Sequence, residues 1–116
     1  MIGIAVVGYG YWGPNLVRNF ADAAGCEVAA VCDLREARLA DVARRYPSIR
    51  TVSHVDDLLS DATIDAIVIA TPVSTHYDLA CRALRGRKHV WVEKPMTSTV
   101  DEARRLRDEA ARADRL

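Results

Sequence analysis

The sequence predicts an α/β fold, in which a mostly parallel, doubly wound sheet carries helices on both faces. Short, nearly continuous apolar runs alternate along the chain with amphipathic segments of helical period. Parallel strands that are buried on both faces are typically such unbroken apolar runs. Right-handed crossovers between them produce an open sheet covered on both sides. A chain of 116 residues without repeats or low-complexity linkers is expected to form a single domain, residues 1–116.

The strands are expected where apolar residues run together between turn residues. The first, 2–7, runs directly into glycine, and the second, 27–32, ends at Asp33. A third is short, the fourth is a continuous apolar run before Thr71-Pro72, and the fifth leads into Glu93. The predicted strands are 2–7, 27–32, 50–52, 65–70 and 89–92.

Helices are expected between these strands, with ends marked by proline, glycine and capping residues. Pro14 suits a first helical turn, Pro47 stops a helix, and Gly86 closes one. Either Ser98-x-x-Asp101 or Thr99-x-x-Glu102 could cap the last helix. The predicted helices are 14–23, 35–46, 56–60, 75–84 and 99 to about 115.

A glycine cluster with G-x-G-x-x-G spacing, formed by Gly8, Gly10 and Gly13, follows the first strand and opens the first helix. Asp33 lies 20 residues beyond Gly13, at the end of the second strand. This context is typical of dinucleotide-binding loops, in which the glycines admit the pyrophosphate to backbone N–H groups and the acidic residue binds a ribose hydroxyl. The pattern therefore predicts a dinucleotide site.

The cluster has three other possible interpretations. A turn that needs only positive φ is the simplest. A P-loop requires Gly-Lys-Ser/Thr, whereas Pro14 follows Gly13. A methyltransferase-type glycine loop is a closer rival, since it also follows a first strand and has an acidic partner on the second. Asp33 favours NAD over NADP, because a carboxylate repels a 2′-phosphate. Arg35 and Arg38 could accommodate that phosphate, but a solvated helix face is the preferred interpretation of both.

Polar motifs follow the fourth and fifth strands, and ligands of open α/β sheets bind at those carboxyl ends. Thr71-Pro72 is followed by His76, which could cap a helix or form a hydrogen bond. In Glu93-Lys94-Pro95, Lys94 could bind a substrate hydroxyl and stabilise alkoxide character. A surface ion pair explains the same residues equally well.

The composition narrows the possible partners. Sixteen Lys and Arg balance sixteen Asp and Glu, so no basic footprint for nucleic acid appears. No segment resembles a signal peptide or a membrane span. Three cysteines, an odd number without metal-type spacing, are expected to be reduced thiols in a cytoplasmic protein. No metal site is expected.

Three motifs occur in order along the chain: Gly8-x-Gly10-x-x-Gly13, Thr71-Pro72-x-x-x-His76 and His89-Val-x-Val-Glu93-Lys94-Pro95. Together they resemble the glucose-fructose oxidoreductase / inositol dehydrogenase / MocA (Gfo/Idh/MocA) family, over the whole chain. The resemblance implies a nicotinamide-binding Rossmann domain. It also implies a following α/β domain with a large open sheet, which carries most of the substrate site and usually the oligomer interface.

Carried over by position, the resemblance implies that Gly8 to Gly13 hold the pyrophosphate and that Asp33 holds the adenosine ribose. Lys94 matches the family's catalytic lysine, beside the nicotinamide. The Tyr-Trp-Gly-Pro-Asn form of the loop looks most like members that oxidise the C3 hydroxyl of nucleotide-linked amino sugars. The cofactor-binding set implied is Gly8, Tyr9, Gly10, Tyr11, Trp12, Gly13, Asp33, Leu34, Arg38, Ala70, Thr71, Pro72, His76, Glu93, Lys94 and Pro95.

The expected function is hydride transfer between NAD and a hydroxyl of a sugar, nucleotide sugar or cyclitol, with NADP less favoured. The alternative is a dinucleotide-binding module or sensor without chemistry. The sequence ends where the family's second domain would begin, and no histidine follows His89 to serve as the family's usual base. We therefore expect a truncated domain with little turnover alone, and a homo-oligomeric full-length protein.

Overall fold

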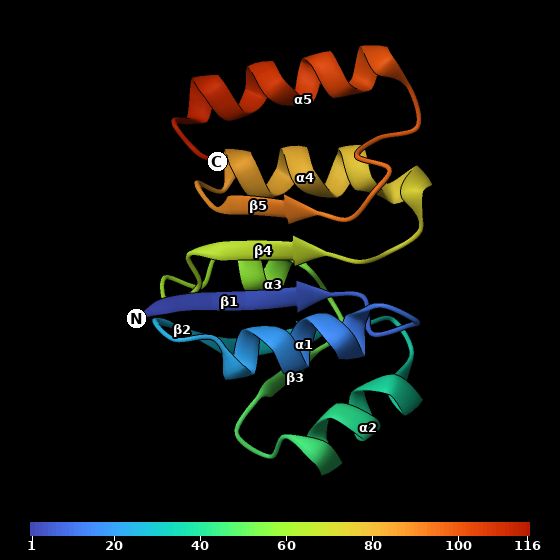
Figure 1. The fold of residues 1–116 in the computed structure, drawn as a ribbon, viewed down its shortest axis with the longest axis vertical. Helices are drawn as coiled ribbons and strands as arrows, with labels where there is room; N and C mark the ends of the chain where they lie inside the picture. The colour runs from blue at the N-terminus through green and yellow to red at the C-terminus, as the bar shows by residue number, and fades with distance from the viewer.

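The computed structural model describes residues 1–116 and contains one five-stranded sheet in the order β3-β2-β1-β4-β5 (Figure 1). All four neighbouring pairs are parallel. The strands are β1 (Ile2–Val7), β2 (Cys26–Cys32), β3 (Arg50–Val52), β4 (Ala66–Ile69) and β5 (His89–Val92). The predicted doubly wound α/β fold is thereby confirmed, and it is a Rossmann fold.

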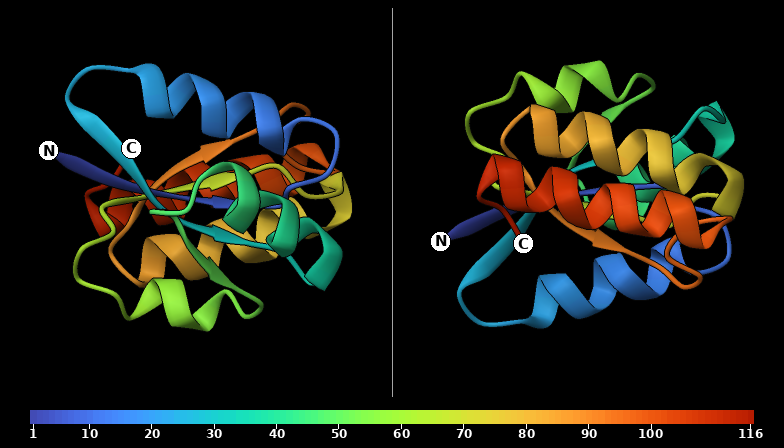
Figure 2. Two further views of the ribbon diagram at one scale, coloured as in Figure 1. Left: turned by 90° about the horizontal axis from the view of Figure 1, so that it is seen from below. Right: turned by 90° about the horizontal axis from the view of Figure 1, so that it is seen from above.

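The helices divide between the two faces of this sheet (Figure 2). Helices α1 and α2 contribute Val17 and Val42 to one apolar cluster, and α3 and α4 contribute Leu58 and Leu84 to the other. Helix α5 packs on α4, at the β5 end of the molecule. Their bounds are α1 (Gly13–Asp22), α2 (Glu36–Arg45), α3 (Asp56–Leu59), α4 (His76–Arg85) and α5 (Val100–Ala113).

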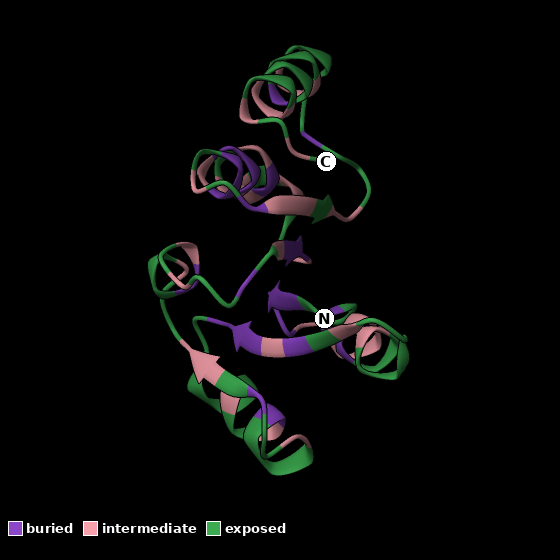
Figure 3. Cartoon of the chain, turned by 90° about the vertical axis from the view of Figure 1, so that its left-hand side faces the viewer, coloured by how far each residue is buried: buried purple, intermediate pink, exposed green.

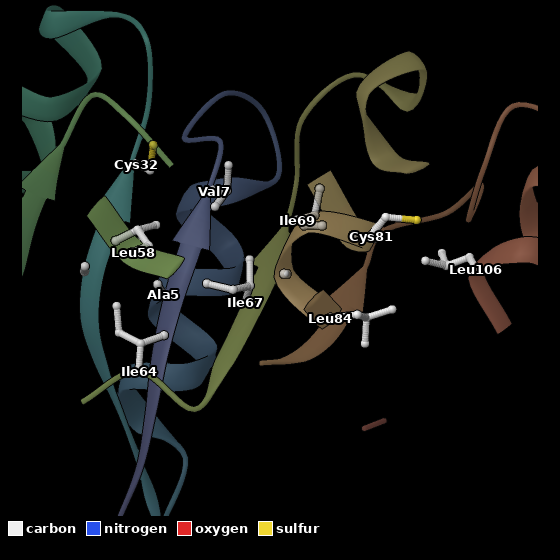
Figure 4. Packing of buried hydrophobic residues seen from close by; sticks show 13 residues of the cluster. Ala5, Val7, Cys32, Leu58, Ile64, Ile67, Ile69, Cys81, Leu84 and Leu106 are labelled. Carbon is white, nitrogen blue, oxygen red and sulfur yellow. The ribbon is translucent and has the colours of Figure 1, made fainter. Parts of the chain in front are cut away.

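The apolar runs are unbroken because each central strand is buried on both faces (Figure 3). Along β1, Ile4 and Val6 point to the α1 and α2 side, whereas Ala5 and Val7 point to the α3 and α4 side. Figure 4 shows the second cluster, where Ile67 and Ile69 of β4 meet side chains of α3 and α4. Successive side chains of a strand alternate between its faces, so one strand supplies both cores.

Most predicted elements differ from the structure by one residue at an end, and the clearest difference lies at α4. The helix expected to start at Thr75 begins at His76, after a 3-10 turn over Val73–Thr75. Thr75 Oγ1 donates to the Pro72 carbonyl at 2.6 Å, which holds this tighter turn together. At α5, the cap is Thr99, whose Oγ1 accepts from Glu102 N at 3.1 Å. Thr99-x-x-Glu102 is therefore the alternative that the structure selects.

None of the helices is long and apolar enough to cross a membrane.

One buried cation contributes to the fold itself: Lys88 is 7% exposed. Its Nζ donates to the carbonyls of Asp61 and Ile64 at 2.7 and 2.8 Å. Lys88 thus ties the segment before β4 to the start of β5, a role that its sequence context did not reveal.

Candidate cofactor-binding site

An open cleft of about 1090 Å³ lies at the carboxyl ends of the strands. The chain runs from β1 outward to β3 and then returns to β4, on the other side of β1. The β1–β4 boundary is therefore the switch point at which open α/β sheets bind ligands. The volume exceeds the typical range of a small-molecule pocket, roughly 300–1,000 Å³, and is sufficient for a dinucleotide.

Two of the three motif glycines are required by the fold. Gly8 has φ +98°, and a Cβ there would lie 2.7 Å from the Ala70 carbonyl oxygen. A Cβ on Gly13 would lie 2.1 Å from the Gly8 carbonyl oxygen, because α1 starts directly against the turn out of β1. Both positions exclude any side chain.

Gly10 differs from both, because only the cleft would receive its side chain. The one protein atom near its hypothetical Cβ is Arg35 Nη2, at 3.4 Å. Gly10 lines the cleft, and its φ is not in the left-handed region. The absence of a side chain there leaves room for a ligand to approach the backbone, which fits a pyrophosphate beside the start of α1.

Asp33 follows β2, and its carboxylate is 6% exposed. Tyr9 N donates to Oδ2 at 2.9 Å, and Arg35 N donates to Oδ1 at 2.8 Å. Burial opposes ionisation, but hydrogen bonds from the Arg35 guanidinium and from these two backbone N–H groups outweigh it. Together they hold the pKa of Asp33 below its ordinary value. The carboxylate therefore reaches the cleft as an anion and ties the glycine loop to the end of β2.

The structure corrects the interpretation of Arg35 as part of a solvated helix face. Arg35 precedes α2 in an extended conformation, which turns its side chain back over Asp33. Its Nε and Nη2 donate to Oδ1 and Oδ2 at 3.1 and 3.2 Å. Arg35 lines the cleft, whereas Arg38, three residues further on in the first turn of α2, does not. The cation beside the expected ribose position is therefore Arg35.

The loops after β4 and β5 form the other wall of the cleft. Thr71, Pro72, Glu93, Lys94 and Pro95 all line it. Lys94 is exposed and has no hydrogen-bond or ion-pair partner within the protein, so its ammonium is available to a ligand. The surface ion pair that would have explained this motif is not formed.

His76 takes a different position from the one expected for a capping residue. It is 2% exposed, and its ring lies between two backbone carbonyls. Nδ1 is 2.9 Å from Pro95 O, and Nε2 is 2.8 Å from Thr71 O. The ring therefore contacts acceptors in two cleft loops and leaves the N–H groups of α4 uncapped.

The remaining residues of the expected set divide between cleft and core. Tyr11, Trp12 and Leu34 are exposed at the cleft, the two aromatic rings meeting edge to face at 5.6 Å. Ala70 also lines the cleft. Tyr9 does not, because its side chain is 5% exposed within the core on the α1 and α2 side. Only the backbone N–H of Tyr9 reaches the site, through Asp33.

Sequence reasoning missed a third wall, formed by residues that follow β3 and by the first turns of α4. The rule that ligands bind at the carboxyl ends of strands could have identified the segment after β3, had it been applied to so short a strand. The cleft residues missed include Ser53, His54, Val55, Asp56, Asp78 and Arg82.

Cys32 is the cysteine that lines the cleft. Burial, followed by the nearby charges of Asp33 and Asp57, raises the pKa of Cys32 to about 11. The thiol at the end of β2 is therefore protonated at neutral pH and unsuited to nucleophilic attack. No group of three His, Cys, Asp or Glu side chains is placed to hold a metal ion.

Acidification is expected to remove the stabilisation that Asp33 contributes. Because its pKa is lower in the folded protein than in the unfolded chain, where it is about 3.9, the contribution is present above that value. It is lost as the pH falls through the folded pKa. Urea unfolding of the wild type and of Asp33→Asn should differ by about 1.5–3 kcal/mol at neutral pH. This difference should shrink in acid, and a constant difference would contradict the assignment.

The chain is similar to known oxidoreductases in both sequence and fold. The Gfo/Idh/MocA family model, described as an oxidoreductase family with an NAD-binding Rossmann fold, matches residues 2–116. The inositol 2-dehydrogenase of Mycolicibacterium smegmatis is 39% identical over 101 residues, which are 86% of this chain and 29% of that protein.

Two solved structures have the same fold over 99% of this chain. GenD2 from gentamicin A biosynthesis, in complex with NAD, has a TM-score of 0.94 at 30% identity. KijD10, a 3-ketoreductase from Actinomadura kijaniata in complex with NADP and TDP-benzene, has a TM-score of 0.92 at 28% identity. The match covers 33% and 35% of those chains. The chain thus spans about a third of the length of its relatives.

Proposed function

The chain belongs to the Gfo/Idh/MocA oxidoreductase family as an NAD(P)-binding Rossmann domain. We propose that it prefers NAD and is the cofactor-binding domain of a sugar or cyclitol dehydrogenase. The observation that carries this proposal is the cleft itself. A side-chain-free loop at Gly10 and the anionic carboxylate of Asp33 face it from one wall, and the unpaired Lys94 faces it from the other.

The proposed placement of the cofactor follows from the charges and free donors of the cleft. The pyrophosphate would lie at Gly10, where backbone N–H groups and the start of α1 favour an anion. Asp33 would accept from the adenosine ribose. Thr71, Pro72 and Lys94 would then border the nicotinamide half, at the ends of β4 and β5.

The preference for NAD rests on Asp33. A 2′-phosphate would lie beside a buried, ionised carboxylate, and that repulsion disfavours NADP. Arg35 opposes this effect, since its guanidinium already lies over the same carboxylate. Relatives include a structure with NAD and one with NADP. We propose that the balance between Asp33 and Arg35 decides which of the two cofactors this chain binds more tightly. In the wild type we expect the guanidinium to be committed to Asp33 and NAD to bind more tightly.

A nicotinamide held between Thr71, Pro72 and Lys94 would supply the hydride chemistry. Lys94 would donate a hydrogen bond to the oxygen of the reacting hydroxyl and stabilise the negative charge that develops there. Glu93, its neighbour in the sequence, also lines the cleft. Of the relatives named above, one is an inositol 2-dehydrogenase and another is a 3-ketoreductase. A nucleotide-linked amino sugar, suggested by Tyr11-Trp12-Gly13, is the narrower substrate class that we propose.

Calorimetry with NAD and NADP on this chain tests the proposal. NAD is expected to bind at least about tenfold more tightly, a difference of about 1.4 kcal/mol. Asp33→Asn should narrow that gap, because the repelling charge is removed while the side-chain shape is kept. Equal or tighter NADP binding by the wild type would contradict the assignment of Asp33 and make Arg35 the determinant. Binding of neither dinucleotide would overturn the proposed function.

A further inference from the structure

The buried ring of His76 connects the loops after β4 and β5, which together form the wall of the cleft that carries Lys94. Thr71 O belongs to the loop after β4, five residues before His76, and Pro95 O belongs to the loop after β5, nineteen residues beyond it. Both carbonyls lie within 3 Å of a ring nitrogen. Pro95 directly follows Lys94, so the ring contacts the loop after β5 at the residue next to Lys94.

The chemistry of these contacts restricts the state of the ring. A carbonyl oxygen only accepts hydrogen bonds, and a neutral imidazole carries one N–H. With a neutral ring, a nitrogen lone pair would face a carbonyl lone pair at one of the two contacts. Both contacts can be hydrogen bonds at the same time only if both nitrogens carry a proton.

The surroundings supply no other partner for this ring. Charged side chains that line the same cleft include Asp78 and Arg82 of α4, and Glu93 and Lys94 of the loop after β5. None of them hydrogen-bonds the ring, whose partners are the two carbonyls. Two charge-assisted hydrogen bonds partly offset the cost of burying the charge.

We propose that His76 is a positioning residue: its doubly protonated ring binds the Thr71 and Pro95 carbonyls together and thereby holds the Lys94 loop against the loop after β4. The two hydrogen bonds are independent of any ligand. Only the consequence for the nicotinamide half of the cofactor rests on the proposed function. His76 itself touches neither substrate nor reacting atoms in this role.

The state of the ring is tested by ¹⁵N NMR of the free chain at about pH 7, where an ordinary histidine is largely neutral. His76→Gln assigns the His76 signals, and the exposed His54 provides the reference for an unconstrained ring. Both ring nitrogens of His76 are expected to show bonded, slowly exchanging protons. A nitrogen without a proton on the His76 ring would overturn the proposal.

The positioning role is tested by comparing NAD with ADP-ribose, which lacks the nicotinamide. His76→Gln should weaken NAD binding about five- to tenfold, the loss expected for one or two hydrogen bonds, and should leave ADP-ribose binding unchanged. His89→Gln is the matched control, since His89 lies outside the cleft. Equal effects on both ligands, or an effect on neither, would contradict positioning.

The two experiments separate the inference from the proposed function. If the wild type binds neither ligand, the proposed function fails, and the NMR result still decides the state of His76. If His76→Gln does not fold, as judged by circular dichroism, the ¹⁵N spectrum of the wild type still shows whether both ring nitrogens of His76 carry a proton. In that case the His54 and His89 signals are assigned from His54→Gln and His89→Gln, and the remaining signal is that of His76.

Discussion

Replacing Gly10 by valine is expected to abolish dinucleotide binding while the fold remains intact. A Cβ at this position meets only the end of the flexible Arg35 side chain, at 3.4 Å, and the backbone does not require positive φ. The added methyl groups would instead occupy the space in which we place the pyrophosphate. We expect NAD affinity, measured by calorimetry, to fall at least about a hundredfold, or 2.7 kcal/mol. The unfolding midpoint should change little.

Gly13→Ala is the matched contrast, because its Cβ would lie 2.1 Å from the Gly8 carbonyl oxygen. That variant should lose stability and binding together, as a steric conflict between two backbone segments cannot be relieved by side-chain movement. Gly10→Ala should fall between the wild type and the valine variant in affinity. A folded Gly10→Val that binds NAD normally would show that this loop is not the phosphate site.

In the dehydrogenase that we propose this domain serves, replacing Lys94 by alanine is expected to slow hydride transfer by about 10²- to 10⁴-fold. The ammonium is exposed in the cleft and has no partner within the protein, so it is free to bind the reacting oxygen. NAD affinity should change little, because the other contacts proposed for the cofactor remain. The rate is measured on the proposed dehydrogenase with sugar and cyclitol substrates, and the affinity by calorimetry on this chain.

Two further variants define that experiment. Lys94→Arg keeps the positive charge but replaces the compact ammonium with a planar guanidinium in a different position. It should therefore recover only part of the rate. Arg107→Ala, on the exposed face of α5, should leave the rate unchanged. If Lys94→Ala retained full activity, the lysine would have no catalytic role.

Much of the fold and part of the site follow from local sequence. Apolar runs such as Ile2–Val7 identify strands that are buried on both faces, because burial on two sides removes the polar alternation. The roles of Gly8 and Gly13 are also local, since both lie in one turn between β1 and α1. The placement of Asp33 at the cleft follows from the rule that a second strand ends beside the first.

The partners of the site residues could not be predicted from spacing. Arg35 turns back onto Asp33 because the chain is extended before α2, and Tyr9 sends its ring into the core while its neighbours Gly8 and Gly10 face the cleft. His76 meets a carbonyl nineteen residues away. These contacts depend on which strands become neighbours and on how their loops meet, which are properties of the packed chain.

The sequence by itself determined the fold class, the glycine turn and the carboxylate at the end of β2, because each depends on residues close together or on strand order. Only the tertiary structure decided that Lys94 is unpaired, that Arg35 covers Asp33 and that His76 joins two loops. The physical reason is that the direction of a side chain is set by the space and the partners that distant segments provide.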